Sequence, residues 1–208
     1  MKSKLGLWLL ASACWGLMSC SSSSTKVEEL EKEEIEVVDF YKGADISWVT
    51  ELESKGHKFY NANGEERECT ALMKEYGMNA IRLRVWVDPS KHDNWCNQED
   101  LLVKAKRAKA LSMEVMVDFH YSDWWADPAK QNIPASWKEH TYEQMKKDVA
   151  NHTKEVLQLL KDNGITPKWV QVGNESSNGF LWDMGHATNN PKQYAGLFAS
   201  GYEAVKEV

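Results

Sequence analysis

The stretch WVQVGNESSNGFLW, residues 169–182, joins a short apolar strand to a polar pair at its end. β-Branched valines favour the strand, and Gly173 leaves room for a close approach of backbone or ligand just before the pair. The pair is Asn174 and Glu175, at the position where an enzyme built on parallel strands would place an acid. Taken alone, Glu175 fits equally well as a cap for the segment that follows, so the rest of the chain has to decide.

Residues 1–20 have the layout of a secretory signal peptide, with Lys2 and Lys4 before an apolar run over residues 5–18. The run ends in a Leu-Met-Ser-Cys segment that resembles a bacterial lipoprotein box. We therefore expect lipidation at Cys20, with the chain exported and lipid-anchored to a bacterial membrane, on a face that the sequence does not specify. The alternative is plain secretion, with Cys20 lost or free.

Residues 21–40 are rich in serine and glutamate, and we expect them to form an extended tether. Their few apolar side chains cannot offset the entropy of ordering, and their like charges repel one another. An acidic run can also be an interaction tail. The formal net charge of the whole chain is -6 and no basic patch is present, so nucleic acid is not an expected partner.

From about residue 41, short apolar runs alternate with longer amphipathic runs, a pattern that predicts a parallel α/β sheet. Strands are expected at residues 42–47, 80–87 and 114–120 and at the opening stretch. The expected helix signals are a turn at Asn63-Gly64 before a helix ending near Gly77, an N-cap at Asn97, a capping box of Thr141 and Gln144, a stop at Asn163-Gly164 and a start at Asn190-Pro191.

This pattern amounts to four β/α units within residues 41–208, with polar and aromatic residues gathered after the strands. That is the loop face at which (β/α)8 barrel enzymes keep their active sites, and a full barrel needs about 250 residues. We therefore expect the (β/α)8 TIM-barrel family with only about the first four β/α units, the N-terminal half of a barrel. Its outer strands would be unpaired edges, so a monomer is expected to aggregate or stay partly molten.

Alternation in the second strand places Arg82 and Arg84 on the face that would point into a barrel. Inward arginines need partners, and Asp45 and Asp118 have the matching parity on the neighbouring strands. A purely structural pair is favoured for Arg82 and Asp118, because buried charges persist mainly when they are paired. Arg84 and His120 lie nearer the mouth and are the better functional candidates.

Asn174 and Glu175 can both face the mouth only if their strand has ended or bulged, which Gly173 makes easier. A partly apolar, aromatic-lined site would raise the pKa of a carboxylic acid, so that it could donate a proton near neutral pH. Cleavage of a glycosidic bond requires such a donor. The adjacent amide could hold a sugar hydroxyl.

Several aromatic residues fall in or beside the loops after the strands, and their flat faces suit the apolar faces of sugar rings. Taken singly, each favours core or loop packing; together they favour a carbohydrate groove. These residues are Trp86, Tyr121, Trp124, Trp125 and Trp182.

Other kinds of chemistry lack their signatures in this sequence. The histidines have no compact metal-ligand spacing and no CxxC or HExxH element is present, so we expect no metal and no cofactor. No G-x-S-x-G elbow supports a serine hydrolase. Cys69 and Cys96 would both lie at the loop end of the barrel, and whether they pair in an exported protein stays open.

Four motifs stand in order along the chain: GADIS at residues 43–47, RLRVW at 82–86, DFHYSD at 118–123 with WADP at 125–128 and Gln131, and QVGNE at 171–175 with Gly179, Leu181 and Trp182. Together they resemble glycoside hydrolase family 53, the endo-β-1,4-galactanases. Four ordered motifs are far more specific than any one of them.

The resemblance implies a (β/α)8 barrel of retaining glycosidases that act on the β-1,4-galactan side chains of pectin, with arabinogalactan as the substrate class. It makes Glu175 the acid/base and brings Asn174 to the sugar at the cleavage point. The substrate-binding residues expected in total are Asn174, Arg84, His120, Trp86, Asp45, Trp125 and Trp182.

The nucleophile of this family is a second glutamate on a late strand, and no acid of this sequence matches it. A retaining mechanism needs two carboxyl groups about 5 to 5.5 Å apart, so we expect the 208-residue chain to be inactive or nearly so. Two alternatives remain. One is a non-catalytic galactan-binding lipoprotein, and the other is a gene fragment without function.

Overall fold

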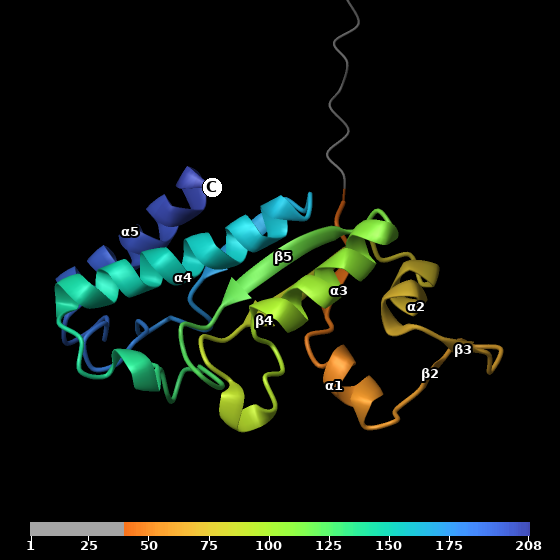
Figure 1. Ribbon diagram of the computed structural model, residues 1–208, viewed down its shortest axis with the longest axis horizontal. Helices are drawn as coiled ribbons and strands as arrows, with labels where there is room; N and C mark the ends of the chain where they lie inside the picture. Colours follow the sequence, from red (N-terminus) through yellow and green to blue (C-terminus); the bar gives the residue numbers. More distant parts are fainter. Residues whose placement is uncertain (1–39) are drawn as a thin grey trace, which may run out of the picture. The chain divides into compact units, whose positions relative to one another are not determined.

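The computed structural model describes residues 40–208, drawn in colour in Figure 1. The predicted signal peptide, the lipidation site at Cys20 and all but the last residue of the predicted tether lie outside the described residues. Within residues 40–208, no helix is both long enough and apolar enough to cross a membrane.

The structure is built on a four-stranded parallel sheet in the order β1-β4-β5-β6. The strands are β1 (Gly43–Asp45), β4 (Ala80–Val85), β5 (Glu114–Phe119) and β6 (Trp169–Val172), so the four predicted strands are confirmed with shorter bounds. The register places Asp45 beside Arg82 and Arg84 beside Asp118. Side chains of the predicted inward face therefore meet across strands.

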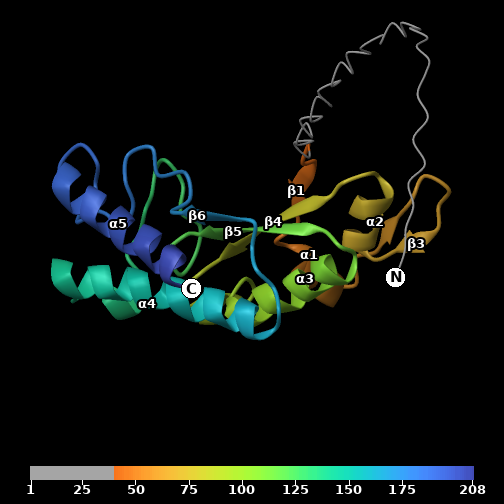
Figure 2. The same ribbon diagram turned by 90° about the horizontal axis from the view of Figure 1, so that it is seen from above.

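The connecting helices are α2 (Cys69–Glu75), α3 (Gln98–Ala110), α4 (Tyr142–Asp162) and α5 (Pro191–Glu207). The Asn97 side chain accepts a hydrogen bond from the Asp100 amide, and Thr141 forms the predicted capping box with Gln144. Figure 2 shows α3 and α4 lying along one face of the strands, with α5 packed against α4.

The main core lies between the sheet and these helices. Leu83, Val117 and Phe119 are fully buried, and they belong to the alternate residues of β4 and β5 that face the helices. Helix α4 contributes Met145 and Val149, which are also fully buried. The other alternate residues of these strands, on the opposite face of the sheet, include the polar residues of the candidate site.

Two elements at the start of the sheet were not predicted: helix α1 (Val49–Ser54) and an antiparallel hairpin of β2 (Phe59–Tyr60) and β3 (Glu66–Arg67). The predicted Asn63-Gly64 turn does form, but it joins these two strands. Asn61 shapes it, since its Oδ1 accepts hydrogen bonds from the amides of Asn63 and Glu65. Two short 3-10 helices, η1 (Ser90–His92) and η2 (Ala135–Trp137), lie in the loops that follow β4 and β5.

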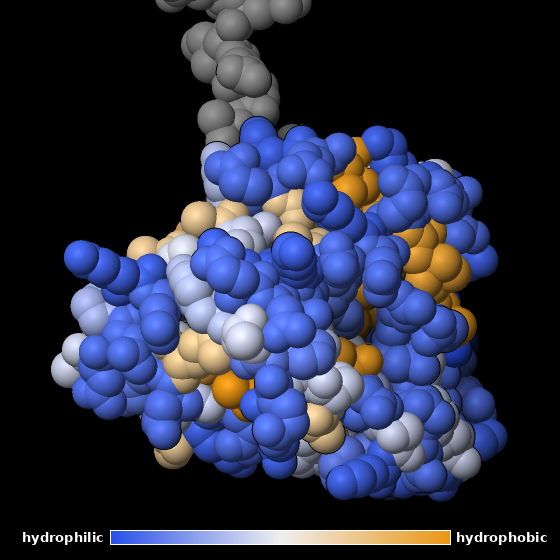
Figure 3. Space-filling view, turned by 60° about the vertical axis from the view of Figure 1, so that its left-hand side comes forward, coloured by the Kyte–Doolittle hydropathy of each residue, from blue (hydrophilic) through white to orange (hydrophobic). Residues whose placement is uncertain are grey.

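Both edges of the sheet are free within residues 40–208, because β1 pairs only with β4 and β6 only with β5. Helix α5 leaves Phe198 41% and Tyr202 49% exposed. Figure 3 shows one face of the molecule, mainly hydrophilic, with hydrophobic residues gathered in strips between the polar ones. The predicted unpaired edges are therefore present in the described part of the chain.

Candidate active site

Arg82 is the centre of a polar network on the inward face of the sheet. Its Nη1 atom lies 2.7 Å from Asp45 Oδ2, and its Nη2 atom lies 2.7 Å from Asp118 Oδ2. Nη2 also donates to Asn174 Oδ1 at 2.9 Å and to Gln171 Oε1 at 3.2 Å. The predicted pair of Arg82 and Asp118 is confirmed, and one guanidinium ties all four strands together.

His120 continues this network toward the mouth, and its hydrogen bonds define its tautomer. Its Nδ1 atom accepts from the Trp86 indole and from the Ala126 amide, both at 3.2 Å. The neutral ring therefore carries its proton on Nε2, which lies 3.1 Å from Asp118 Oδ2 and donates to it. Asp118 has no exposed side-chain surface, and it is held between the arginine and this imidazole.

Asn174 is fixed directly behind the expected acid. Strand β6 ends at Val172 and Gly173 adopts a φ of 88°, so the alternation of the strand does not continue through the pair. The side-chain Nδ2 of Asn174 donates to the Ala126 carbonyl at 2.8 Å. The backbone carbonyl of Asn174 accepts from Gln131 Nε2 at 2.8 Å. With the bond from Arg82, the amide has a single orientation.

Glu175 has a different environment from its neighbour. Its backbone adopts a φ of 46° and its carbonyl accepts from Gln131 Nε2 at 3.5 Å. Its side chain is exposed, and its carboxyl group makes no hydrogen bond or ion pair with another described residue. The apolar enclosure that we expected around this carboxyl is therefore not formed by residues 40–208.

Asp45 is kept ionised by its partners. Burial acts to raise the pKa of its carboxyl, but hydrogen bonds from the Ser47 hydroxyl and amide and from Arg82 outweigh burial and lower the pKa below its usual value. The Ser47 bonds are 2.6 Å from Oγ and 2.9 Å from the amide. Asp45 is thus engaged as an acceptor.

Arg84 lies in an aromatic cage rather than in an ion pair. Its guanidinium carbon is 4.1 Å from the ring centre of Trp48, 4.8 Å from that of Trp86 and 4.3 Å from that of Trp125. Arg84 is only 2% exposed, and its Nε and Nη2 atoms have no hydrogen-bond partner among the described residues. Cation–π attraction to three indoles compensates its buried charge, and its predicted contact with substrate stays a prediction.

The aromatic candidates separate into two groups. Trp86 and Tyr121 are 0% and 1% exposed and act in packing, Tyr121 through a 2.8 Å hydrogen bond with Thr153. Trp124 and Trp125 are half-buried, and Trp124 stacks on His92 with ring centres 3.5 Å apart. Trp182, also half-buried, is positioned by a 3.0 Å bond from its indole to the Asn178 carbonyl. The half-buried indoles are the ones with a face left for a ligand.

The structure resolves the question of the cysteines. Cys69 and Cys96 are both buried free thiols, so they do not form a disulfide. Burial raises the pKa of Cys69 to about 11 and also raises the pKa of Cys96. No group of three or more histidine, cysteine or acidic residues in the described range could hold a metal ion.

Three functional supports had escaped sequence reasoning: Trp48 in the cage, Ser47 at Asp45, and Lys104. The Lys104 ammonium is fully buried and donates to the Ser47 carbonyl at 2.8 Å and to Asp100 Oδ2 at 2.6 Å. Helix α3 thereby holds the loop after β1 in place. In sequence, Asp100 and Lys104 have the spacing of an ordinary surface pair on a helix, and no signal marks their burial.

Known proteins match this chain closely over its described part. The endo-beta-1,4-galactanase of Bacillus subtilis (strain 168) is 35% identical over 226 residues, covering 100% of this chain and 52% of that protein. The probable arabinogalactan endo-beta-1,4-galactanase A of Aspergillus terreus is 41% identical over 167 residues, covering 80% and 47%. The chain thus spans about half the length of the curated relatives that it matches.

Structural comparison agrees with the sequence. The GH53 catalytic domain of Ignisphaera aggregans superimposes with a TM-score of 0.77 at 40% identity, over 82% of this chain and 49% of that one. The model of the family described as glycosyl hydrolase family 53 matches residues 41–208. This family is a TIM barrel, so the parallel sheet with its helices is part of one, as predicted. The chain belongs to glycosyl hydrolase family 53.

Proposed function

We propose that this chain is the N-terminal half of an endo-acting β-1,4-galactanase and that Glu175 is its acid/base. The observation that carries the proposal is the fixed Asn174 beside a free carboxylate. Hydrogen bonds with Arg82 and the Ala126 carbonyl orient the side-chain amide of Asn174. The Glu175 side chain is exposed and has no hydrogen-bond partner among the described residues. The galactanase names of two relatives that are 35% and 41% identical support the choice of substrate.

In the proposed mechanism, Glu175 protonates the oxygen of the scissile β-1,4 bond while a second carboxylate attacks the anomeric carbon. Water then hydrolyses the glycosyl-enzyme, with Glu175 acting as base. Asn174 would hold a sugar hydroxyl at the cleavage point, and the half-buried faces of Trp125 and Trp182 would support rings of the galactan or arabinogalactan chain.

The second carboxylate would come from outside residues 40–208. Asp45 and Asp118 are both bound to Arg82, and Asp118 is also bound to His120, so neither is free to attack. The 208-residue chain by itself is therefore proposed to turn over no substrate, or almost none.

A sensitive reducing-end assay on linear β-1,4-galactan tests this proposal. We expect no turnover by the 208-residue chain, and retained binding of galacto-oligosaccharides that weakens in Asn174→Ala. Turnover that disappears in Glu175→Gln would refute the inactivity while confirming the acid. Binding of an unrelated β-glucan in preference to galactan would refute the substrate.

We also propose that the chain is lipidated at Cys20 and anchored to a bacterial membrane, on the basis of the sequence of residues 17–20. Mass spectrometry of the protein expressed in a bacterial host should show an acylated N-terminal cysteine. The variant Cys20→Ala should leave the membrane fraction, and an unmodified, freely secreted wild type would contradict the proposal.

A further inference from the structure

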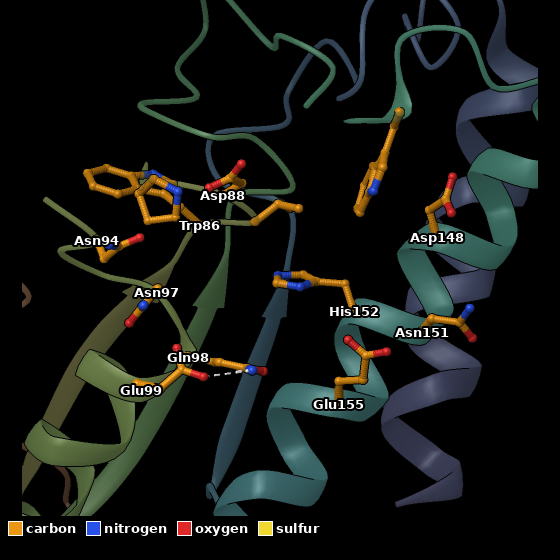
Figure 4. Close-up of a pocket in the computed structure, with 13 residues that line it drawn as sticks. Trp86, Asp88, Asn94, Asn97, Gln98, Glu99, Asp148, Asn151, His152 and Glu155 are labelled. Carbon is orange, nitrogen blue, oxygen red and sulfur yellow. Dashed lines mark hydrogen bonds between the residues drawn. The ribbon is translucent and has the colours of Figure 1, made fainter. Parts of the chain in front are cut away.

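A cleft of about 440 Å³ lies on the helical side of the sheet, between the segment 86–99 that follows β4 and the first half of α4. In Figure 4 the loop after β4 carries Asp88 and Asn94 and the first turn of α3 carries Glu99, while α4 carries Asp148 and Glu155 on the opposite side. Every lining residue belongs to the described part of the chain.

The α4 wall is a single polar stripe. Asp148, Asn151, His152 and Glu155 are spaced so that they share one face of the helix. Asp148 binds His140 at 2.6 Å, but the side chains of Asn151 and Glu155 have no hydrogen-bond partner among the described residues. On the facing loop, the side-chain amide of Asn94 likewise has no partner among the described residues. Donors and acceptors thus face each other across the hollow.

The charge of the walls narrows the class of ligand. The lining includes four carboxylates and no lysine or arginine, so phosphate and uronate groups are excluded by repulsion. The carboxylates do not form a metal site, since no qualifying cluster occurs in residues 40–208. The carboxamides and carboxylates of the two walls suit a neutral polyhydroxylated molecule, whose hydroxyls donate to acids and accept from amides.

The floor of the cleft has one polar atom without a partner. The His152 ring lies between the two walls in Figure 4 and makes edge-on contacts with Phe119 and Trp137. Its Nε2 atom is buried and forms no hydrogen bond in the described structure. Burial lowers the pKa of this imidazole to about 4, so the ring is neutral near neutral pH. The neutral ring keeps one nitrogen as a donor and the other as an acceptor, and these are the two roles that a sugar hydroxyl can match.

We propose that this cleft is a second binding site for neutral oligosaccharide, separate from the site around Glu175. The inference rests on the proposed function for its choice of sugar, namely β-1,4-linked galactose. Trp86 separates the two sites, since it lines the cleft while its indole binds His120 of the inward network. A polysaccharide chain held here would stay close to the loop end of the barrel.

Amide-resolved NMR of the 208-residue chain, titrated with galactotetraose, tests the proposal. The side-chain NH2 signals of Asn94 and Asn151 should shift. Glu155→Ala should weaken binding at these signals about tenfold, which is the effect of losing one hydrogen bond to a charged group. The matched control is Gln158→Ala, on the same helix but outside the cleft, and it should bind like the wild type.

The outcomes separate this inference from the proposed function. Shifts around Asn174 with none at Asn94 or Asn151 would overturn the second site and leave the proposed function intact. Shifts at the cleft alone would support the second site and count against the sugar contact at Asn174. If the signals of Asn94 and Asn151 shift with spermidine but not with galactotetraose, the proposal of a sugar ligand is overturned and the cleft binds an organic cation instead.

Discussion

At the scale of single residues, the network around Arg82 is as much a requirement for folding as for chemistry. Arg82→Met removes the charged partner of Asp118, whose fully buried side chain then keeps only the His120 imidazole as a donor. It also removes one partner of Asp45. Removing one partner of a buried ion pair lowers the free energy of unfolding by about 3–5 kcal/mol. Urea denaturation should show a loss of unfolding free energy in this range.

The control for that experiment is Lys58→Met, which breaks an exposed pair with Glu66. Exposed pairs contribute about 0–1 kcal/mol. Equal losses for the two variants would show that Arg82 and Asp118 do not behave as a buried pair.

His152 makes stability depend on pH. The imidazole has a pKa of about 4 in the folded chain against 6.5 ordinarily, because burial disfavours its charged form. The folded state therefore binds fewer protons, so this residue's contribution is fully present above pH 6.5 and is lost as the pH falls toward 4. The difference between the two pKa values corresponds to a contribution of about 3 kcal/mol to the free energy of unfolding.

Unfolding titrations of the wild type and His152→Leu at pH 7 and pH 4.5 test this effect. The difference between the two pH values should be clearly smaller in His152→Leu. The variant His57→Ala, which changes an exposed histidine, should keep the pH dependence of the wild type. An unchanged slope in His152→Leu would mean that other groups carry the acid sensitivity.

At the scale of elements, helix α4 depends on its first turn. The Thr141 hydroxyl accepts from the Gln144 amide, and the Gln144 side chain accepts from the Thr141 amide. Thr141→Ala is expected to lower the unfolding free energy by about 1 kcal/mol, because amides at the helix start lose an acceptor. Thermal melts followed by circular dichroism measure the loss. Ser136→Ala, an exposed change just upstream, should melt like the wild type.

Helix ends and strands were the elements that the sequence predicted well, because local residue types determine them. Asn97 and Thr141 cap their helices through their own side chains, and alternation in β4 follows from the pleat. The hairpin of β2 and β3 was missed because each of its strands is only two residues long and β3 is Glu-Arg. Two residues are too few to show the alternation of apolar and polar side chains from which a strand is predicted.

The candidate site was predictable in part. Strand alternation alone predicted that Arg82, Asp45 and Asp118 share the inward face. The register of the parallel strands places them close enough to form ion pairs. The cage around Arg84 includes Trp48 from another loop, and Lys104 is buried by tertiary packing; neither position carries a local signal of its role. The exposure of Glu175 also depends on which segments surround the mouth, which no local pattern reveals.

At the scale of the whole molecule, the free edges of β1 and β6 should govern behaviour in solution. Unpaired strand edges are templates for association, and exposed Phe198 and Tyr202 add apolar surface on α5. Sedimentation velocity of the 208-residue chain should therefore reveal concentration-dependent association. A monomer that persists at all concentrations, with a single cooperative melt, would contradict this expectation.

The aromatic cage has an optical consequence. Trp86 and Trp124 have ring centres 4.4 Å apart, and Trp48 lies 5.6 Å from Trp125 and 6.1 Å from Trp124. The electronic transitions of indoles at such separations couple, and a fixed arrangement of them gives a strong circular dichroism signal. The near-ultraviolet spectrum should therefore carry an exciton doublet that reports whether the loops around Arg84 have assembled, independently of the far-ultraviolet signal of the helices.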